Sequence, residues 1–65
     1  MLITIEGPSN YMNRKTARDV QKSVLQDERS CVIANDCVEG QPSKTFVRHC
    51  LQIADVVIVT KGASR

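Results

Sequence analysis

The run VVIV at residues 56–59 constrains the fold of this chain more than any other feature of the sequence. Its four consecutive residues are all β-branched, and such residues favour strands. The run shows no alternation of polar and apolar positions, which indicates a strand that is buried on both faces. Such a strand requires other elements on each side of its sheet, as in α/β proteins.

Two segments have the apolar spacing of amphipathic helices. The first covers residues 14–28, with Asn13 as its expected N-cap, and the second covers residues 44–53, with Ser43 as its expected N-cap. Charged residues occupy the opposite face of the first segment. The apolar positions are Ala17, Val20, Val24 and Leu25 in the first segment and Phe46, Val47, Cys50, Leu51 and Ala54 in the second.

Shorter apolar runs at residues 2–5 and 31–34 precede the two helical segments, so the expected order is β-α-β-α-β. Alternation of this kind implies a parallel sheet with right-handed crossovers. We predict a single minimal α/β domain over residues 1–65. Its three-stranded parallel sheet has strand order 2-1-3 and carries one helix on each face. In that order the third strand lies at an edge, where its apolar residues are expected to pair with another copy and form a homo-oligomer.

Charge and composition argue against several classes of partner. Nine basic and seven acidic residues give a net charge of +2, which is too balanced to indicate binding of a nucleic acid polymer. Tyr11 and Phe46 are the two aromatic residues, too few for a base-stacking platform. No run approaches the roughly 18 apolar residues of a membrane span, and Glu6 interrupts the first apolar run, unlike a signal peptide. We therefore expect a cytoplasmic chain without membrane contact.

The cysteines do not indicate a metal site. Cys31, Cys37 and Cys50 form no CxxC pair, and with His49 their spacing fits no standard zinc pattern. We interpret Cys31 and Cys50 as small core residues of a reduced protein. We expect neither a metal nor a cofactor.

The stretch EGPSNYMNRKT at residues 6–16 resembles a phosphate loop until its spacing is counted. Seven residues separate Gly7 from Lys15, and the second glycine of a P-loop is absent. A Gly-Pro turn at the end of a strand nevertheless lets the backbone approach a ligand closely. Helix starts at such turns favour anions.

Polar residues gather at all three expected strand ends, and the carboxyl ends of parallel strands form the ligand crevice of open α/β sheets. Turns, helix caps and an exposed basic tail would explain the same residues without a ligand. The ligand-binding candidates are Gly7, Pro8, Ser9, Asn10 and Asn13 after the first strand, Asn35 and Asp36 after the second, and Lys61, Ser64 and Arg65 after the third.

Four segments resemble the nucleoside 2-deoxyribosyltransferase-like family: ITIEGPSN at residues 3–10, VIAN at 32–35, ADVVIV at 54–59 and KGASR at 61–65. The resemblance implies that the Gly-Pro loop binds a nucleoside. In that family a glutamate nucleophile lies on a helix beyond the Ser-Arg loop, whereas this sequence ends at Arg65. Arg48 and His49 also occupy the place of an acidic residue before the third strand. The resemblance therefore implies binding without catalysis.

Three functions follow from these observations. The first is non-catalytic binding, or sequestration, of a nucleotide or nucleoside-derived small molecule, a role that would suit a phage accessory protein. The alternative is a small phage-type interaction protein that binds and inhibits a host protein through its edge strand or a helix face. The third is a residual enzyme, either a hydrolase of N-glycosidic bonds or a degenerate kinase.

Overall fold

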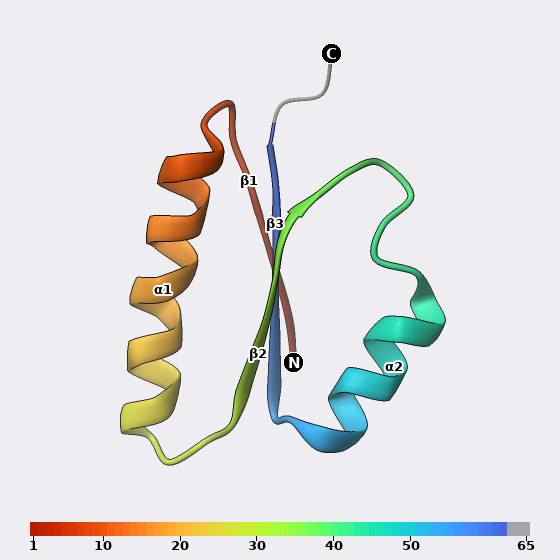
Figure 1. The fold of residues 1–65 in the computed structure, drawn as a ribbon. Coiled ribbons are helices and arrows are strands. Elements are labelled where there is room, and N and C mark those ends of the chain that lie inside the picture. Colours follow the sequence, from red (N-terminus) through yellow and green to blue (C-terminus); the bar gives the residue numbers. More distant parts are fainter. Residues whose placement is uncertain (63–65) are drawn as a thin grey trace.

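The computed structural model describes residues 1–62, and the predicted β-α-β-α-β order is confirmed (Figure 1). The elements are β1 (Leu2–Glu6), α1 (Asn10–Gln26), β2 (Cys31–Cys37), α2 (Lys44–Ile53) and β3 (Val56–Lys61). All three strands are parallel and belong to one sheet, as the predicted α/β class requires. Within the described part of the chain, neither helix has the length and apolar character needed to cross a membrane.

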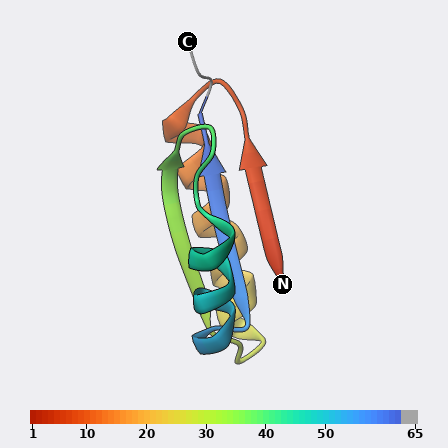
Figure 2. The same ribbon diagram turned by 90° about the vertical axis from the view of Figure 1, so that its right-hand side faces the viewer.

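The predicted strand order 2-1-3 is wrong, because the sheet has the order β1-β3-β2 and β3 is its central strand (Figure 2). The side chains of residues 56–60 are at most 2% exposed, and each of them lies on one of two covered faces. In a sheet of three strands, the middle strand is the one that helices on both faces cover most completely. The homo-oligomer contact predicted through β3 is therefore wrong as well, since both edges of β3 are already paired.

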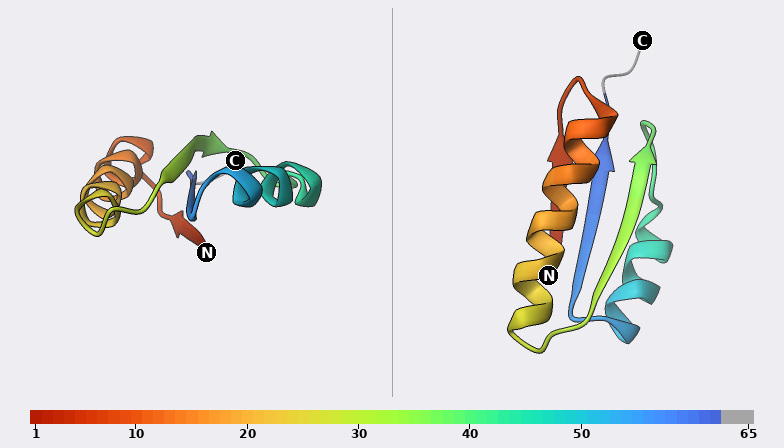
Figure 3. Two further views of the ribbon diagram at one scale, coloured as in Figure 1. Left: turned by 90° about the horizontal axis from the view of Figure 1, so that it is seen from below. Right: turned by 60° about the vertical axis from the view of Figure 1, so that its left-hand side comes forward.

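One helix lies on each face of the sheet, as predicted (Figure 3). On one face, Ala17 of α1 is fully buried against Val56 and Ile58 of β3. On the other face, Cys50 of α2 packs against the alternate β3 residues Val57 and Val59. The chain passes from β1 over β3 to β2 and then returns to β3. The crossover through α1 moves across the sheet in one direction, and the crossover through α2 moves back in the other. Because both crossovers have the same hand, their helices lie on opposite faces.

The start of α1 differs from the prediction. Ser9, and not Asn13, is its N-cap: the Ser9 hydroxyl accepts a hydrogen bond from the Met12 N–H at 3.2 Å. The helix therefore begins four residues before the expected start at residue 14. Ser43 caps α2 as predicted, because its hydroxyl accepts from the Phe46 N–H at 3.1 Å. Leu25, expected in the apolar stripe of α1, is 53% exposed.

A reciprocal pair of hydrogen bonds holds the starts of β2 and β3 together. The Ser30 N–H donates to the Asp55 carboxylate at 3.2 Å, and the Asp55 N–H donates to the Ser30 hydroxyl at 2.9 Å. The Val56 N–H also donates to the Ser30 carbonyl at 3.1 Å. Asp55 therefore stabilises the amino ends of the strands, at the opposite end of the sheet from the predicted ligand crevice.

The double burial of β3 predicts a large difference between two isoleucines. We expect Ile58→Ala to lower the free energy of unfolding by about 2–5 kcal/mol, because it opens a cavity in the core. The same substitution at Ile53, which is 66% exposed, should change it by less than about 0.5 kcal/mol. Urea denaturation followed by circular dichroism measures both. Equal midpoints for the two variants would contradict the central placement of β3.

Candidate functional site

A pocket of about 490 Å³ opens at the carboxyl ends of the strands. The loop after β1 leads to α1 on one face, and the loop after β2 leads to α2 on the other face, so the two loops diverge around the end of β3 (Figure 1). Crevices of this origin are the usual ligand sites of open α/β sheets, and ligand pockets commonly measure roughly 300–1,000 Å³. The lining residues are Glu6, Asn10, Asp36, Cys37, Val38, Glu39, Lys61 and Gly62.

A β-bulge near the end of β2 shapes one wall of this pocket. Ala34 pairs with Val59, but the next paired residue of β2 is Cys37, opposite Lys61, so β2 contains one extra residue. Within the bulge, Asp36 has a φ of 59°, in the left-handed region that residues other than glycine rarely adopt. Bulges of this kind redirect side chains, and they are frequent next to functional sites.

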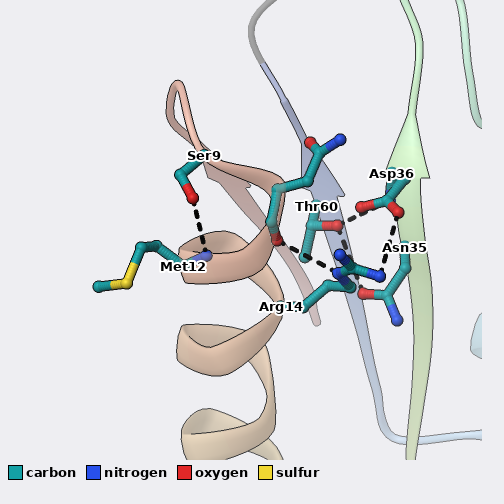
Figure 4. Close-up of polar contacts among 7 residues, drawn as sticks. Ser9, Met12, Arg14, Asn35, Asp36 and Thr60 are labelled. Carbon is teal, nitrogen blue, oxygen red and sulfur yellow. Dashed lines mark hydrogen bonds and ion pairs between the residues drawn. The ribbon is translucent and has the colours of Figure 1, made fainter.

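The buried hydroxyl of Thr60 holds the bulge in place (Figure 4). It accepts a hydrogen bond from the Asp36 N–H at 2.8 Å and donates to the Asn35 amide oxygen at 3.4 Å. The hydroxyl thus replaces a backbone hydrogen-bond partner that the bulge displaces. Thr60 itself stays fully buried. The conformation of β2 at the pocket therefore depends on a side chain from β3.

Arg14 of α1 connects the bulge with the start of its own helix. Its guanidinium lies 3.6 Å from the Asp36 carboxylate, and its Nε donates to the Asn10 carbonyl at 3.3 Å (Figure 4). The Arg14 and Asp36 side chains are 46% and 39% exposed, so this ion pair contributes at most about 1 kcal/mol to stability. Its effect is to orient the carboxylate of Asp36 toward α1.

Of the predicted ligand-binding residues, Asn10, Asp36 and Lys61 line the pocket together. They come from the ends of α1, β2 and β3, as the convergence of parallel strands implies. Asn10 packs so closely on Gly62 that a Cβ at position 62 would lie 1.8 Å from the Asn10 amide oxygen. The glycine that follows β3 therefore makes room for the Asn10 side chain.

Gly7 and Asn13, also predicted to bind ligand, instead fix the turn between β1 and α1. Asn13 is 5% exposed, and its Nδ2 donates to the carbonyl oxygens of Gly7 at 3.1 Å and Lys61 at 3.0 Å. The Gly7 N–H in turn donates to the Lys61 carbonyl at 3.2 Å. Neither residue lines the pocket, so we leave both out of the candidate site.

The other predicted residues lie outside the pocket lining. Ser9 caps α1, Pro8 is exposed in the turn, and Asn35 accepts from Thr60. The roles of Ser9 and Pro8 are among the structural explanations that the sequence left open, whereas the contact of Asn35 with Thr60 was not predicted. Ser64 and Arg65 lie outside the described residues.

Five lining residues were not predicted: Glu6, Cys37, Val38, Glu39 and Gly62. Glu6 and Cys37 each stand opposite Lys61 in the register of the sheet, so these three side chains share one face. That relation was hidden in the sequence because it depends on β3 lying between β1 and β2. Val38 and Glu39 enter the pocket because they follow the bulge, which has no clear sequence signal.

The pocket carries more negative than positive charge. Its lining contains the carboxylates of Glu6, Asp36 and Glu39 but one ammonium group, that of Lys61, within residues 1–62. Carboxylates accept hydrogen bonds from hydroxyl and amino groups and repel phosphates. The described part of this pocket therefore suits polyhydroxyl or amino groups better than phosphate.

The cysteines are placed as core and pocket residues, and none forms a disulfide. Burial raises the pKa of the Cys31 thiol, which packs in the core beneath α1. Cys50 is 4% exposed beneath α2. Among residues 1–62, no cluster of three or more histidine, cysteine or acidic side chains has the geometry to hold a metal ion.

Comparison of the chain with protein-family models, curated proteins and solved structures found no match. The resemblance to nucleoside 2-deoxyribosyltransferase-like proteins therefore stays a prediction based on the quoted segments. The geometry and charge of the pocket are therefore the basis for a function.

The buried hydroxyl that supports the bulge provides a second stability prediction. Thr60→Val keeps the side-chain volume but leaves the Asp36 N–H without its acceptor, so we expect a loss of about 1–3 kcal/mol in the free energy of unfolding. Thr16→Val, on the exposed surface of α1, is the matched control and should cost less than about 0.5 kcal/mol. Urea denaturation compares the two variants. A Thr60→Val protein as stable as the control would show that the hydroxyl is dispensable.

Proposed function

We propose that this chain binds a nucleoside-derived small molecule, without catalysis, in the pocket at the carboxyl ends of its strands. One observation carries the proposal: Asn10 at the start of α1 and Asp36 and Lys61 near the ends of β2 and β3 line a single pocket of about 490 Å³. That convergence is expected for a ligand crevice in an α/β sheet. Structural roles in turns and caps do not by themselves require the three side chains to share a cavity.

The charge of the pocket narrows the class of ligand. Asp36 and Glu39 offer carboxylate oxygens that suit the hydroxyls of a ribose, and the Asn10 amide can pair with a hydroxyl or a base edge. Val38 adds an apolar surface beside them. Within residues 1–62 the lining holds three carboxylates, one of them paired with Arg14, against one ammonium group, so the proposal favours a nucleoside over a nucleotide. All these residues come from one chain, and the site does not require the oligomer expected from the sequence.

The thiol of the pocket lacks the partner that a cysteine nucleophile would need. A cysteine nucleophile is activated by an adjacent base, most often a histidine. The Cys37 thiol of the pocket lies 3.7 Å from the Ala34 carbonyl oxygen, and His49 is exposed on α2 and does not line the pocket. No thiol–imidazole pair therefore forms at the pocket among residues 1–62. Sequestration of the ligand is the role that we propose.

Thermal stabilisation by a panel of nucleosides and their 5′-monophosphates tests this function. We expect at least one nucleoside to raise the melting temperature, with about 2.7 kcal/mol of stabilisation at a concentration of a hundred times its Kd. The corresponding monophosphate should stabilise the protein less. A panel without any effect would contradict the proposal. Release of free base above a buffer blank would instead support a residual enzyme.

Variants then locate the binding. Asp36→Asn should weaken binding of the active nucleoside by about tenfold, because a carboxylate that accepts from hydroxyl groups is replaced by a neutral amide. Asp19→Asn, on the exposed surface of α1 and away from the pocket, is the matched control and should bind as the unsubstituted protein does. Calorimetric titration measures both affinities. Equal losses in both variants would place the ligand elsewhere.

A further inference from the structure

Among residues 1–62, the outer edge of β1 presents backbone groups that pair with no other strand. Within residues 1–62, β1 pairs with β3 alone. The Met1 carbonyl accepts from the Val57 N–H at 2.8 Å, and the Gly7 N–H donates to β3 at 3.2 Å, so the odd-numbered residues face β3. Since backbone groups alternate in direction along a strand, the even-numbered residues face outward. These outward-facing residues are Leu2, Thr4 and Glu6, whose side chains are also exposed.

The two edges of the sheet differ in how they are protected. The edge strand β2 is interrupted by its bulge and by the left-handed Asp36, features that hinder pairing with a further strand. β1 keeps an uninterrupted register with β3 over all five of its residues. A regular edge strand of this kind is a template for an added strand.

A groove of about 410 Å³ lies directly beside this free edge, between β1 and α2. It exists because α2 lies over β3 and β2 while β1 lies beside it (Figure 2), and the apolar cluster around Cys50 includes residues of β3 and β2. Leu2 and Leu51 are consequently 48% and 38% exposed. The lining residues that matter here are Leu2, Val47, Leu51, Lys44, Arg48 and Lys61.

Charge and apolar surface are distributed unevenly along the groove. All three ionisable residues that line it within residues 1–62 are basic, namely Lys44, Arg48 and Lys61. Because α2 runs opposite to the strands, its start lies nearer to their carboxyl ends than its end does (Figure 1). The groove lining therefore changes from Leu2 and Leu51, through Arg48, to Lys44 and Lys61 toward the carboxyl end of β1, where Glu6 stands opposite Lys61.

We propose that β1 and this groove bind an extended segment of a partner protein, which adds to the sheet as a fourth strand. The segment places carboxylates against Lys44 and Lys61 at one end and apolar side chains against Leu2 and Leu51 at the other. Its backbone pairs with the outward groups of β1, and its alternate side chains enter the groove. Main-chain bonds supply affinity in this mode of recognition, and the charge gradient supplies direction.

The charges disfavour a second copy of this chain as the occupant. In a two-fold antiparallel pairing of two β1 strands centred on Thr4, Glu6 of each copy would stand opposite Leu2 of the other. Glu6, the single carboxylate of the second copy's β1, would then lie beside Leu2, away from Lys44 and Lys61. A partner with a separate acidic and apolar half fits the groove better.

Short blocked peptides test the proposal with the whole chain. The probe alternates threonine with groove-facing residues, as acetyl-Glu-Thr-Glu-Thr-Val-Thr-Val-Thr-amide and as its reversed sequence, because a fourth strand can run in either direction. Peptides with lysine in place of glutamate are the controls. We expect one glutamate peptide to bind, to bind more weakly at raised salt, and to slow amide hydrogen exchange at Leu2, Thr4 and Glu6 by about tenfold. The Ile3 and Ile5 amides, which face β3, should exchange as before.

Two variants separate the edge from the groove. Thr4→Pro removes an outward N–H and no bond to β3, so it should weaken peptide binding by about tenfold while the strand still forms. The double variant Lys44→Glu/Arg48→Glu should weaken binding to a similar extent, about tenfold, through charge repulsion. Its control, Arg18→Glu/Lys22→Glu, reverses two exposed charges on α1 and should leave the affinity unchanged.

Several results would overturn the proposal. One is failure of both glutamate peptides to bind, and another is equal binding of the lysine peptides. Slowed exchange at Leu2, Thr4 and Glu6 in a dimer without any peptide would assign the edge to a second copy. Because Lys44 and Arg48 do not line the nucleoside pocket, loss of peptide binding in their variant is distinguishable from loss of the proposed nucleoside binding.

Discussion

The structure depends on the burial of β3 between two helices. Each residue of this strand from Val56 to Thr60 is at most 2% exposed. Successive side chains point alternately toward α1 and toward α2. Val56 and Ile58 contact the α1 side, while Val57 and Val59 contact the α2 side. A chain of this size buries only about 60% of its unfolded surface, so a single strand that serves both cores contributes much of the available apolar burial. β1 and β2 then hydrogen-bond to its two edges.

The same strand connects the core to the candidate site. Thr60 follows the buried run and is itself fully buried, yet its hydroxyl supports the bulge that contains Asp36. Lys61, one residue later, lines the pocket, and its carbonyl holds the turn between β1 and α1 through Gly7 and Asn13. The positions of the pocket walls therefore depend on how far β3 extends past its apolar run.

The two proposed binding surfaces arise from the small size of the fold. With two helices for a three-stranded sheet, α1 covers its face more completely than the ten-residue helix α2 covers the other. The uncovered part of that face lies over β1, next to the free edge of the sheet. At the carboxyl ends, the diverging loops leave the pocket over Lys61. Both surfaces include Lys61, so ligands at the two could affect each other's affinity through this residue.

Local patterns in the sequence were enough to predict the elements and their order. The β-branched run, the two helices and Ser43 as a cap depend on neighbouring residues, and the structure confirms them. Of the predicted apolar stripes, Leu25, Phe46 and Leu51 are exposed. The unbroken apolar run also indicated a strand buried on both faces, which in a sheet of three strands belongs at the centre. The predicted order 2-1-3 contradicts that indication. It arose because both orders place one helix on each face, so helix placement alone does not separate them.

Part of the candidate site was predictable in the same way, because Asn10, Asp36 and Lys61 lie at or after the carboxyl ends of strands that must end at the same edge. Tertiary structure alone decided the rest. The register of β3 placed Glu6 and Cys37 beside Lys61, and a contact between Thr60 and Asp36 stabilised the bulge. The tertiary structure also buried Asn13, whose side chain donates hydrogen bonds to the carbonyls of Gly7 and Lys61 at the turn after β1. These outcomes depend on residues far apart in the chain, whereas sequence patterns report mainly on near neighbours.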